Sequence, residues 1–174
     1  MLEITKANIT EISDVITHYK TVIEQIKDYD FTPGWEFGIH PTEEHIKKAI
    51  ESGELYIVRI DSEIAGSLII DNNSLEANDK IDWTYDLTDE ETYFIHLVAV
   101  NQDYRNRGIA KRMLSYADEL AKRNSIKSIR LCLNKTNSNI EGLYLKAGFE
   151  YMGTVDVYIQ KRGNITFKLY EKIV

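Results

Sequence analysis

The N-terminal third of the chain contains two stretches with helical spacing of apolar residues. Leu2–Lys6 predicts a short first strand. Over 10–27 the apolar residues recur three and four positions apart, which predicts an amphipathic helix. The prolines and glycines of Asp30–Pro41 predict a loop. Thr42 can cap a second, short helix that ends before Gly53.

Short apolar runs predict strands in the middle of the chain. Leu55–Ile60 and Glu63–Ile70 flank a tight turn, which is typical of a β-hairpin. A polar segment, Asp71–Glu91, follows them. Tyr93–Val100 is almost continuously apolar and predicts a central strand that is covered on both faces. From Ile109 onward the apolar residues return to helical spacing.

The C-terminal third predicts three strands and one helix. Ser128–Leu133 predicts a strand, and Thr136–Ala147 predicts a helix that Gly148 ends as a left-handed cap. Phe149–Ile159 and Ile165–Lys172 predict the last two strands. The resulting order, β-α-α-β-β-β-α-β-α-β-β, favours an α/β fold with a central mixed β-sheet flanked by helices.

Composition and charge exclude several classes of protein. The 174 residues predict one domain, 1–174. Lys and Arg number 21 against 28 Asp and Glu, a net charge of −7, which disfavours a nucleic-acid partner because phosphates need a basic surface. Cys132 is the only cysteine, so no internal disulfide is expected, and no residue spacing indicates a metal site. No apolar run nears the ~20 residues that span a bilayer, and the N-terminus lacks a signal-peptide core, so we expect a cytoplasmic protein without a membrane partner.

A polar turn after the predicted central strand has the chemistry of an anion site. The strand ends at Val100, and Arg105–Ala110 then opens a helix. Free N–H groups and the positive end of the dipole at a helix start attract anions, and the small residues Gly108 and Ala110 let a phosphate approach the backbone. The alternative is a solvated loop with a basic helix start. The turn matches neither a P-loop nor a dinucleotide fingerprint.

Two motifs together resemble a known family. Arg105-x-x-Gly108-x-Ala110 is similar to the Q/R-x-x-G-x-G/A signature of the GNAT superfamily of N-acetyltransferases. About 35 residues downstream, Leu143–Phe149 resembles the family's L-Y-x-K-x-G-F signature, with Asn137 where the family usually has an asparagine. The element order also resembles that of the family along nearly the whole chain. Departures are Ala110 where glycine is commoner and Ile140 where the family usually has alanine.

The resemblance implies an acyltransferase that uses acetyl-CoA as co-substrate and needs no metal. It implies that the pyrophosphate lies on backbone N–H groups of the turn and that the pantetheine arm runs beside the end of the central strand, where the fourth and fifth strands splay apart. The cofactor-binding residues implied in this way are Val98, Ala99, Val100, Arg105, Asn106, Arg107, Gly108, Ile109, Ala110 and Asn137.

Two side chains are candidates for proton transfer. The resemblance implies that Tyr144 donates a proton to the leaving thiolate; the alternative is a packing residue before a Gly-Phe stop. Asn137 precedes Tyr144 by seven residues, two turns of the predicted helix, so we expect both on one side. His96 interrupts the apolar central strand, on the face that strand alternation shares between Phe94 and Val98, and can act as a base. The alternative is a core histidine bonded to backbone.

The acceptor is the least defined part of the prediction. Between Glu76 and Glu91 the chain has seven acidic residues against Lys80, which is either a solvated, mobile insert or an acidic rim that attracts a cationic amine. In the second interpretation the aromatic side chains of nearby loops line the acceptor pocket: Trp35, Phe37, Trp83 and Tyr85.

The predicted function is transfer of an acetyl group to a primary amine of a small molecule, directly within a ternary complex. Cys132 lies in an alternating strand and is not expected to carry an acetyl group. The alternatives are acetylation of a protein or peptide amine, a CoA-binding regulator without catalysis, and a structural module. The identity of the amine stays open, as does the oligomeric state, for which the resemblance suggests a homodimer.

Overall fold

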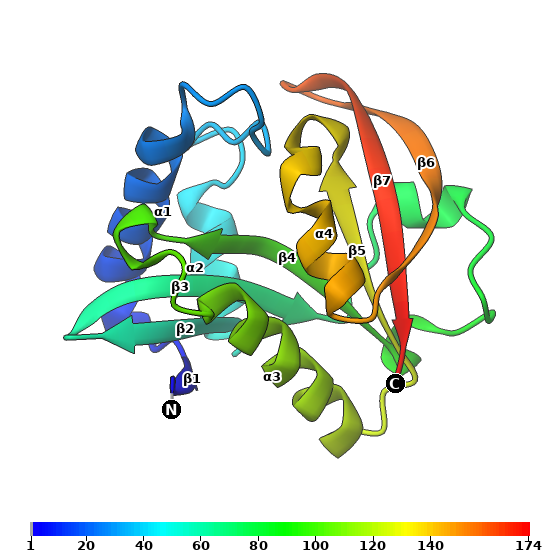
Figure 1. Ribbon diagram of the computed structural model, residues 1–174, viewed down its shortest axis with the longest axis horizontal. Coiled ribbons are helices and arrows are strands. Elements are labelled where there is room, and N and C mark those ends of the chain that lie inside the picture. The colour runs from blue at the N-terminus through cyan, green and yellow to red at the C-terminus, as the bar shows by residue number, and fades with distance from the viewer. Residues whose placement is uncertain (1) are drawn as a thin grey trace. The chain divides into compact units, whose positions relative to one another are not determined.

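A mixed β-sheet forms the frame of the protein in a computed structural model that describes residues 2–174 (Figure 1). The sheet has the strand order β1-β2-β3-β4-β5-β7-β6 and is flanked by helices, which confirms the predicted α/β fold class and element order. The strands are β1 Ile4–Lys6, β2 Leu55–Ile60, β3 Glu63–Asp71, β4 Thr92–Val100, β5 Ser128–Asn134, β6 Glu150–Ile159 and β7 Gly163–Ile173. The helices are α1 Ile12–Ile26, α2 Glu43–Glu51, α3 Ile109–Arg123 and α4 Glu141–Lys146.

The chain divides into two compact units. Unit 1 comprises Met1–Tyr29, Trp35–Ile70 and His96–Tyr116. Unit 2 comprises Asp30–Gly34, Asp71–Ile95 and Ala117–Val174. Residue 1 lies outside the described residues, and the single domain over 1–174 stays a prediction.

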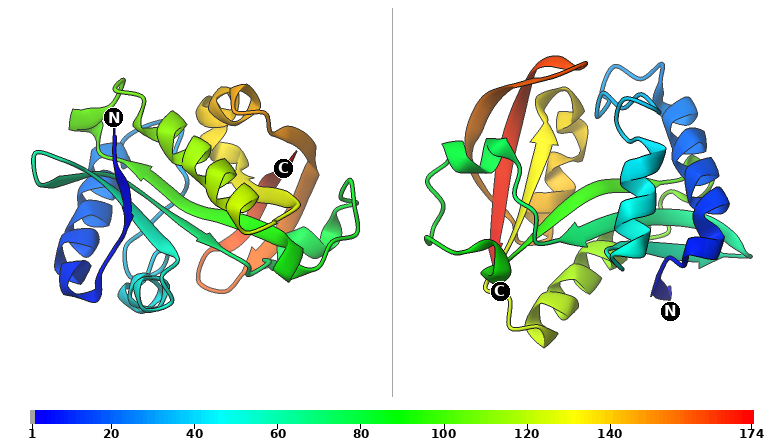
Figure 2. Two further views of the ribbon diagram at one scale, coloured as in Figure 1. Left: turned by 90° about the horizontal axis from the view of Figure 1, so that it is seen from below. Right: turned by 180° about the vertical axis from the view of Figure 1, so that it is seen from behind.

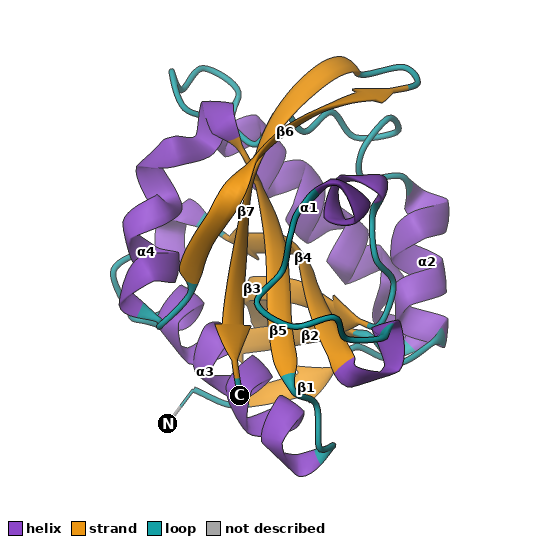
Figure 3. Cartoon of the chain, turned by 90° about the vertical axis from the view of Figure 1, so that its right-hand side faces the viewer, coloured by secondary structure: helices purple, strands orange, loops and turns teal. Residues whose placement is uncertain are grey.

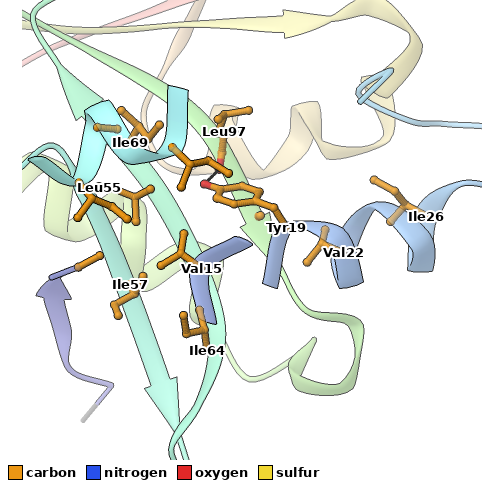
Figure 4. Packing of buried hydrophobic residues seen from close by; sticks show 14 residues of the cluster. Val15, Tyr19, Val22, Ile26, Leu55, Ile57, Ile64, Ile69 and Leu97 are labelled. Carbon is orange, nitrogen blue, oxygen red and sulfur yellow. Dashed lines mark hydrogen bonds between the residues drawn. The ribbon is translucent and has the colours of Figure 1, made fainter. Parts of the chain in front are cut away.

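Unit 1 is built on the β2–β3 hairpin, to which β1 adds an antiparallel edge. Asp61 and Ser62 both have positive φ, 49° and 70°, in the two-residue turn, as hairpin turns that match the strand twist require. Helices α1 and α2 lie side by side (Figure 2). Their apolar faces pack with inward residues of β2 and β3 in one core, in which Val15, Tyr19 and Leu55 are fully buried (Figure 4).

Unit 2 contains an antiparallel ribbon, β6 and β7, which is visibly twisted (Figure 3). β7 also pairs antiparallel with β5. Successive side chains of a strand point to opposite faces. Ile165, Phe167 and Leu169 of β7 accordingly share one core with Val157 of β6 and Ala77 of the polar segment.

A buried ion pair fixes part of the polar segment in unit 2. Arg130 Nε donates to Glu171 Oε1 at 2.9 Å, and the two side chains are 5% and 1% exposed. Ser128 and the Thr84 N–H also donate to Glu171. Arg130 donates further to the Tyr85 carbonyl at 3.1 Å. Because each ion has several hydrogen bonds, the cost of removing these charges from water is offset.

The helix predicted over Thr136–Ala147 is not continuous. Lys135–Ile140 forms a 3₁₀ turn in which Asn137 has non-helical φ and ψ, and α4 begins only at Glu141. Asn134 accepts the Thr136 N–H through its side chain at 3.1 Å. Short polar side chains of this kind compete with helical hydrogen bonds. The argument that Asn137 and Tyr144 share one helix face is therefore wrong.

Candidate active site

The turn between β4 and α3 leaves open space beside its backbone. Asn106 and Gly108 adopt left-handed φ values of 62° and 76°. Asparagine tolerates this region better than most residues, and glycine adopts it freely. A Cβ built on Gly108 would meet no heavy atom within 4 Å, so the space beside this glycine is open to a ligand.

The start of α3 presents unpaired backbone donors. The Arg112 N–H donates to the Gly108 carbonyl at 2.9 Å, which is the first hydrogen bond of the helix. The N–H groups of Ile109 and Ala110 precede that bond and have no partner within the helix. Together with the positive end of the helix dipole they suit a phosphate group. Arg105 and Arg107 add two exposed cations to the same turn.

Gly66 of β3 is a residue of this region that the sequence analysis did not identify. A Cβ built there would lie 2.7 Å from Ile109 Cγ2 and 3.3 Å from the Ala99 carbonyl oxygen. Glycine at this position therefore allows the first turn of α3 to approach β3. The Ile109 side chain is buried and anchors the start of the helix. Its backbone N–H lies in the first turn and makes no hydrogen bond within the helix. Only the tertiary packing reveals this requirement, because an isolated glycine in a strand has many explanations.

Strand β4 is irregular where the pantetheine arm is predicted to lie. Its parallel register with β5 runs from Thr92 to Ile95, and no described residue beyond Ile95 pairs with β5. Leu97 has φ of 49°, which is not an extended conformation. Side chains before and after Leu97 therefore do not alternate as in a regular strand. The argument that His96 shares one strand face with Phe94 and Val98 does not hold.

The side chains around Leu97 divide by burial. Leu97 and Ala99 belong to the core of unit 1, whereas His96, Val98 and Val100 are partly exposed. Side chains can reach a ligand only from the second set, so Ala99 offers its backbone alone.

Tyr19 of α1 supports the irregular strand. Its hydroxyl donates to the Leu97 carbonyl at 3.1 Å (Figure 4). Burial raises the pKa of Tyr19, so the phenol keeps its proton and remains a donor. Tyr19 lies within the first predicted helix, but no local pattern in the sequence indicates this bond, which joins residues 78 positions apart.

Tyr144 of α4 occupies a well-defined position in unit 2. The helix ends in a Schellman motif: the Phe149 N–H donates to the Tyr144 carbonyl and the Gly148 N–H to the Leu145 carbonyl, both at 3.1 Å. The Tyr144 and Phe149 rings pack edge to face with centroids 6.1 Å apart. The Leu143–Phe149 signature thus has a structural explanation, because Gly148 adopts φ of 89° and Phe149 covers the helix end.

Tyr144 is 4% exposed, and burial raises the pKa of its phenol well above the usual value. No hydrogen bond joins its hydroxyl to any other residue within 2–174. A phenol in these surroundings stays protonated, which is the state that a proton donor needs.

Three of the four predicted acceptor aromatics have different surroundings. Trp35 packs on the core of unit 1, with its ring edge-on to Tyr19 at 6.2 Å. Trp83 lies under the Arg130 guanidinium at 4.2 Å and donates its indole N–H to the Asn78 carbonyl. These contacts give both tryptophans structural partners. Tyr85 is 57% exposed.

The structure thus groups the predicted residues in two sets. Unit 1 holds His96, the end of β4 and Arg105–Ala110, whereas unit 2 holds Asn137, Tyr144, Trp83 and Tyr85. Among residues 2–174, no three His, Cys, Asp or Glu side chains gather so that they could hold a metal ion. No helix that these residues form is long and apolar enough to cross a membrane.

The turn at the start of α3 thus has the chemistry of an anion site on an α/β fold. A sequence model described as Acetyltransferase (GNAT) family matches residues 21–149, and the chain belongs to this family. It is an N-acetyltransferase that uses acetyl-CoA as co-substrate. The open side of Gly108 and the unpaired N–H groups of α3 fit the phosphates of that molecule.

Solved structures share the fold across nearly the whole chain. An acetyltransferase of the GNAT family from Streptococcus agalactiae is 19% identical, with 99% of this chain and 95% of that chain covered and a TM-score of 0.79. A ribosomal-protein-alanine N-acetyltransferase from Brucella melitensis is 16% identical, with coverages of 99% and 100% and a TM-score of 0.73. The protein yncA from Salmonella typhimurium, solved with its cofactor acetyl-CoA, is 11% identical, with coverages of 99% and 94% and a TM-score of 0.71. A search of curated proteins gave no match.

Proposed function

We propose that this enzyme acetylates a primary amine of a small molecule by direct transfer within a ternary complex. The observation that carries the proposal is the turn after β4, with its left-handed Asn106 and Gly108 and the unpaired N–H groups that follow. In this proposal the turn Arg105–Ala110 binds the pyrophosphate through backbone N–H groups, and Val98–Val100 and Asn137 bind the pantetheine arm.

Two protons move in the proposed reaction. The co-substrate supplies an acetyl thioester, whose C–S bond breaks as the C–N bond forms. His96, directly or through a water, takes the proton that the amine nitrogen loses. Tyr144 gives its proton to the departing sulfur and regains one from solvent. Burial raises the pKa of Tyr144, so the phenol carries its proton until the thiolate forms.

Cys132 supports direct transfer over an acetylated enzyme. Its thiol donates to Asn78 Oδ1 at 3.3 Å, and burial raises its pKa to about 12. A thiol needs to ionise to act as a nucleophile, so Cys132 is a poor acetyl carrier near neutral pH.

Acidic residues favour a cationic acceptor. In the segment Glu76–Glu91, Asp82, Asp86 and Asp89 are exposed. Such a cluster raises the local concentration of ammonium ions and the rate of their encounter. Lower activity at higher ionic strength is expected for a cationic amine, because salt screens this attraction. The second candidate is a protein or peptide amine, on which the Brucella melitensis neighbour is named as acting.

The test is release of CoA thiol from acetyl-CoA in the presence of a panel of acceptors. The panel holds polyamines, aminoglycosides, free amino acids and a peptide with an N-terminal alanine. A clear preference for a small amine supports the proposal. Thiol release with the peptide alone favours the protein-directed alternative, and no release beyond hydrolysis with any amine contradicts both.

The phosphate assignment is tested by Gly108→Glu. The new carboxylate places bulk and negative charge where the pyrophosphate is proposed to lie, so acetyl-CoA binding measured by calorimetry should be abolished. Gly163→Glu is a matched control, because Gly163 has φ of 77° against 76° at Gly108 and its Cβ would also meet nothing within 4 Å. Both variants carry the same backbone cost of about 1–2 kcal/mol, so only the loss of binding separates them. Equal affinities would refute the assignment.

A further inference from the structure

The first residue of α4 is tied to β7 by both of its carboxylate oxygens. Glu141 Oε2 accepts from Lys168 Nζ at 3.0 Å, and Glu141 Oε1 accepts from the Tyr170 hydroxyl. Lys168 and Tyr170 stand two positions apart on β7, so they share one face of the strand. The opposite face, with Phe167 and Leu169, packs in the core of unit 2.

Helix α4 needs external support to hold one orientation. It has six residues, too few for a helix to be stable by itself. Its C-terminal end is held by the Schellman motif at Gly148. At its N-terminal end Ile140 provides no side-chain cap, and the Glu141 N–H donates to the Ser138 carbonyl of the preceding turn. The Glu141 side chain adds the contacts that join this end to β7.

Tyr170 contacts both Glu141 and Tyr144. Tyr144 follows Glu141 by three residues, which places the two side chains on neighbouring positions of one helix face. The Tyr144 and Tyr170 rings lie with centroids 6.2 Å apart and planes inclined by 36°. Tyr170 is fully buried, so its ring cannot move without disturbing the packing.

We propose that Tyr170 and Lys168 are positioning residues that act through Glu141 to set the orientation of the Tyr144 phenol. This inference rests on the proposed proton donation by Tyr144. Glu141 stays ionised near neutral pH, since its bonds from Tyr170 and Lys168 lower the pKa of its carboxyl. The tether therefore persists under the conditions of the reaction.

The decisive experiment is a double-mutant cycle between Tyr170→Phe and Tyr144→Phe. Tyr170→Phe removes one hydroxyl and keeps the ring. In the parent it should lower kcat about 10- to 100-fold, as expected when a catalytic group is misplaced. The KM and the calorimetric Kd for acetyl-CoA should change less than about twofold. In the Tyr144→Phe background it should have no further effect on kcat, because the group that it positions has gone.

Tyr151→Phe is the matched control. Tyr151 also packs against Tyr170, with ring centroids 5.7 Å apart. It is 50% exposed, and its hydroxyl is hydrogen-bonded to the Thr154 hydroxyl at 2.6 Å. Loss of this hydroxyl should leave kcat unchanged. If Tyr170→Phe yields too little folded protein, Lys168→Met removes the other partner of Glu141 while keeping an aliphatic stem, and the same cycle applies.

The outcomes separate this inference from the role of Tyr144. Additive losses of kcat in the cycle, or an unchanged kcat in both Tyr170→Phe and Lys168→Met, overturn the positioning role and leave Tyr144 as the donor. A normal kcat in Tyr144→Phe overturns both. A fall in acetyl-CoA affinity equal to the fall in kcat shows a general loss of structure and also overturns the positioning role.

Discussion

At the scale of single residues, Tyr144 combines a packing function with a proposed chemical one. Its ring packs against Phe149 and Tyr170, and its carbonyl accepts the Phe149 N–H at the helix end. The hydroxyl makes no hydrogen bond to any described residue, although buried polar groups usually have a partner. In the proposed reaction the leaving thiolate would be a chemically suitable partner for it.

The first prediction follows from that hydroxyl. Tyr144→Phe should lower kcat by about 10²–10⁴-fold, the usual contribution of a general acid. The Kd for acetyl-CoA should hold, because the ring still packs. Steady-state kinetics and calorimetry on one preparation provide the check. If Tyr144→Phe has the same kcat as the parent, solvent or another acid protonates the thiolate.

His96 carries a prediction of a different form. A protonated amine cannot attack, so a base matters most at low pH, where less of the amine is free. We expect His96→Gln to lose more of the parental kcat/KM at pH 6.5 than at pH 9, with the fold and acetyl-CoA affinity unchanged. A loss that is equal at both values would return His96 to a structural role in β4.

At the scale of elements, β4 and α4 depart from regular geometry. At each irregular position, hydrogen bonds or packing contacts hold the backbone. Leu97 of β4 has a left-handed conformation, and its carbonyl accepts a hydrogen bond from the Tyr19 hydroxyl. Helix α4 begins later than predicted because a 3₁₀ turn precedes it, and it ends at the predicted Gly148 cap, where φ is 89°. Irregular backbone costs free energy, so it persists only where surrounding contacts hold it.

The helix end gives a prediction with opposite signs at two glycines. Gly148→Ala forces a left-handed alanine and should destabilise the fold by about 1–2 kcal/mol. Gly142→Ala, inside the same helix with open space around its Cβ, should stabilise it by about 0.5–1 kcal/mol. Urea denaturation of both variants measures the difference. A loss of stability at Gly142 as large as that at Gly148 would contradict the assigned helix end.

At the scale of the whole molecule, stability depends on buried ionisable groups as well as on apolar cores. The Arg130–Glu171 pair is ionised and bonded within unit 2. His18 of α1 is different, because burial lowers its pKa to about 4, against an interaction with the Ile64 backbone that raises it. His18 therefore folds as a neutral side chain near pH 7.

Acid sensitivity follows from His18. The unfolded chain binds a proton there near pH 6.5, but the folded chain binds it only near pH 4, so stability falls as the pH falls between these values. The full effect is about 3 kcal/mol. We expect the parent to lose this amount relative to His18→Leu between pH 7 and pH 4 in urea titrations. Parallel pH profiles for the two proteins would show that His18 is not the source.

Local chemistry determined what could be predicted from the sequence. The periods of apolar residues, the Thr42 cap and the tight turn between β2 and β3 depend on neighbours in the chain, and the structure has them at the expected places. The Arg105–Ala110 turn was predictable for the same reason, because a glycine, small residues and a helix start lie within six positions. The family signatures rest on such local segments.

Only the tertiary structure decided how the candidate side chains are supported. The Tyr19–Leu97 bond joins residues 78 positions apart, and the Tyr170–Glu141 bond joins residues 29 apart. Trp83 packs its ring against the Arg130 guanidinium, although the sequence showed only that its loop is acidic. Contacts of this kind depend on which faces of the strands and helices pack together. The spacing of residues within one segment does not determine that packing.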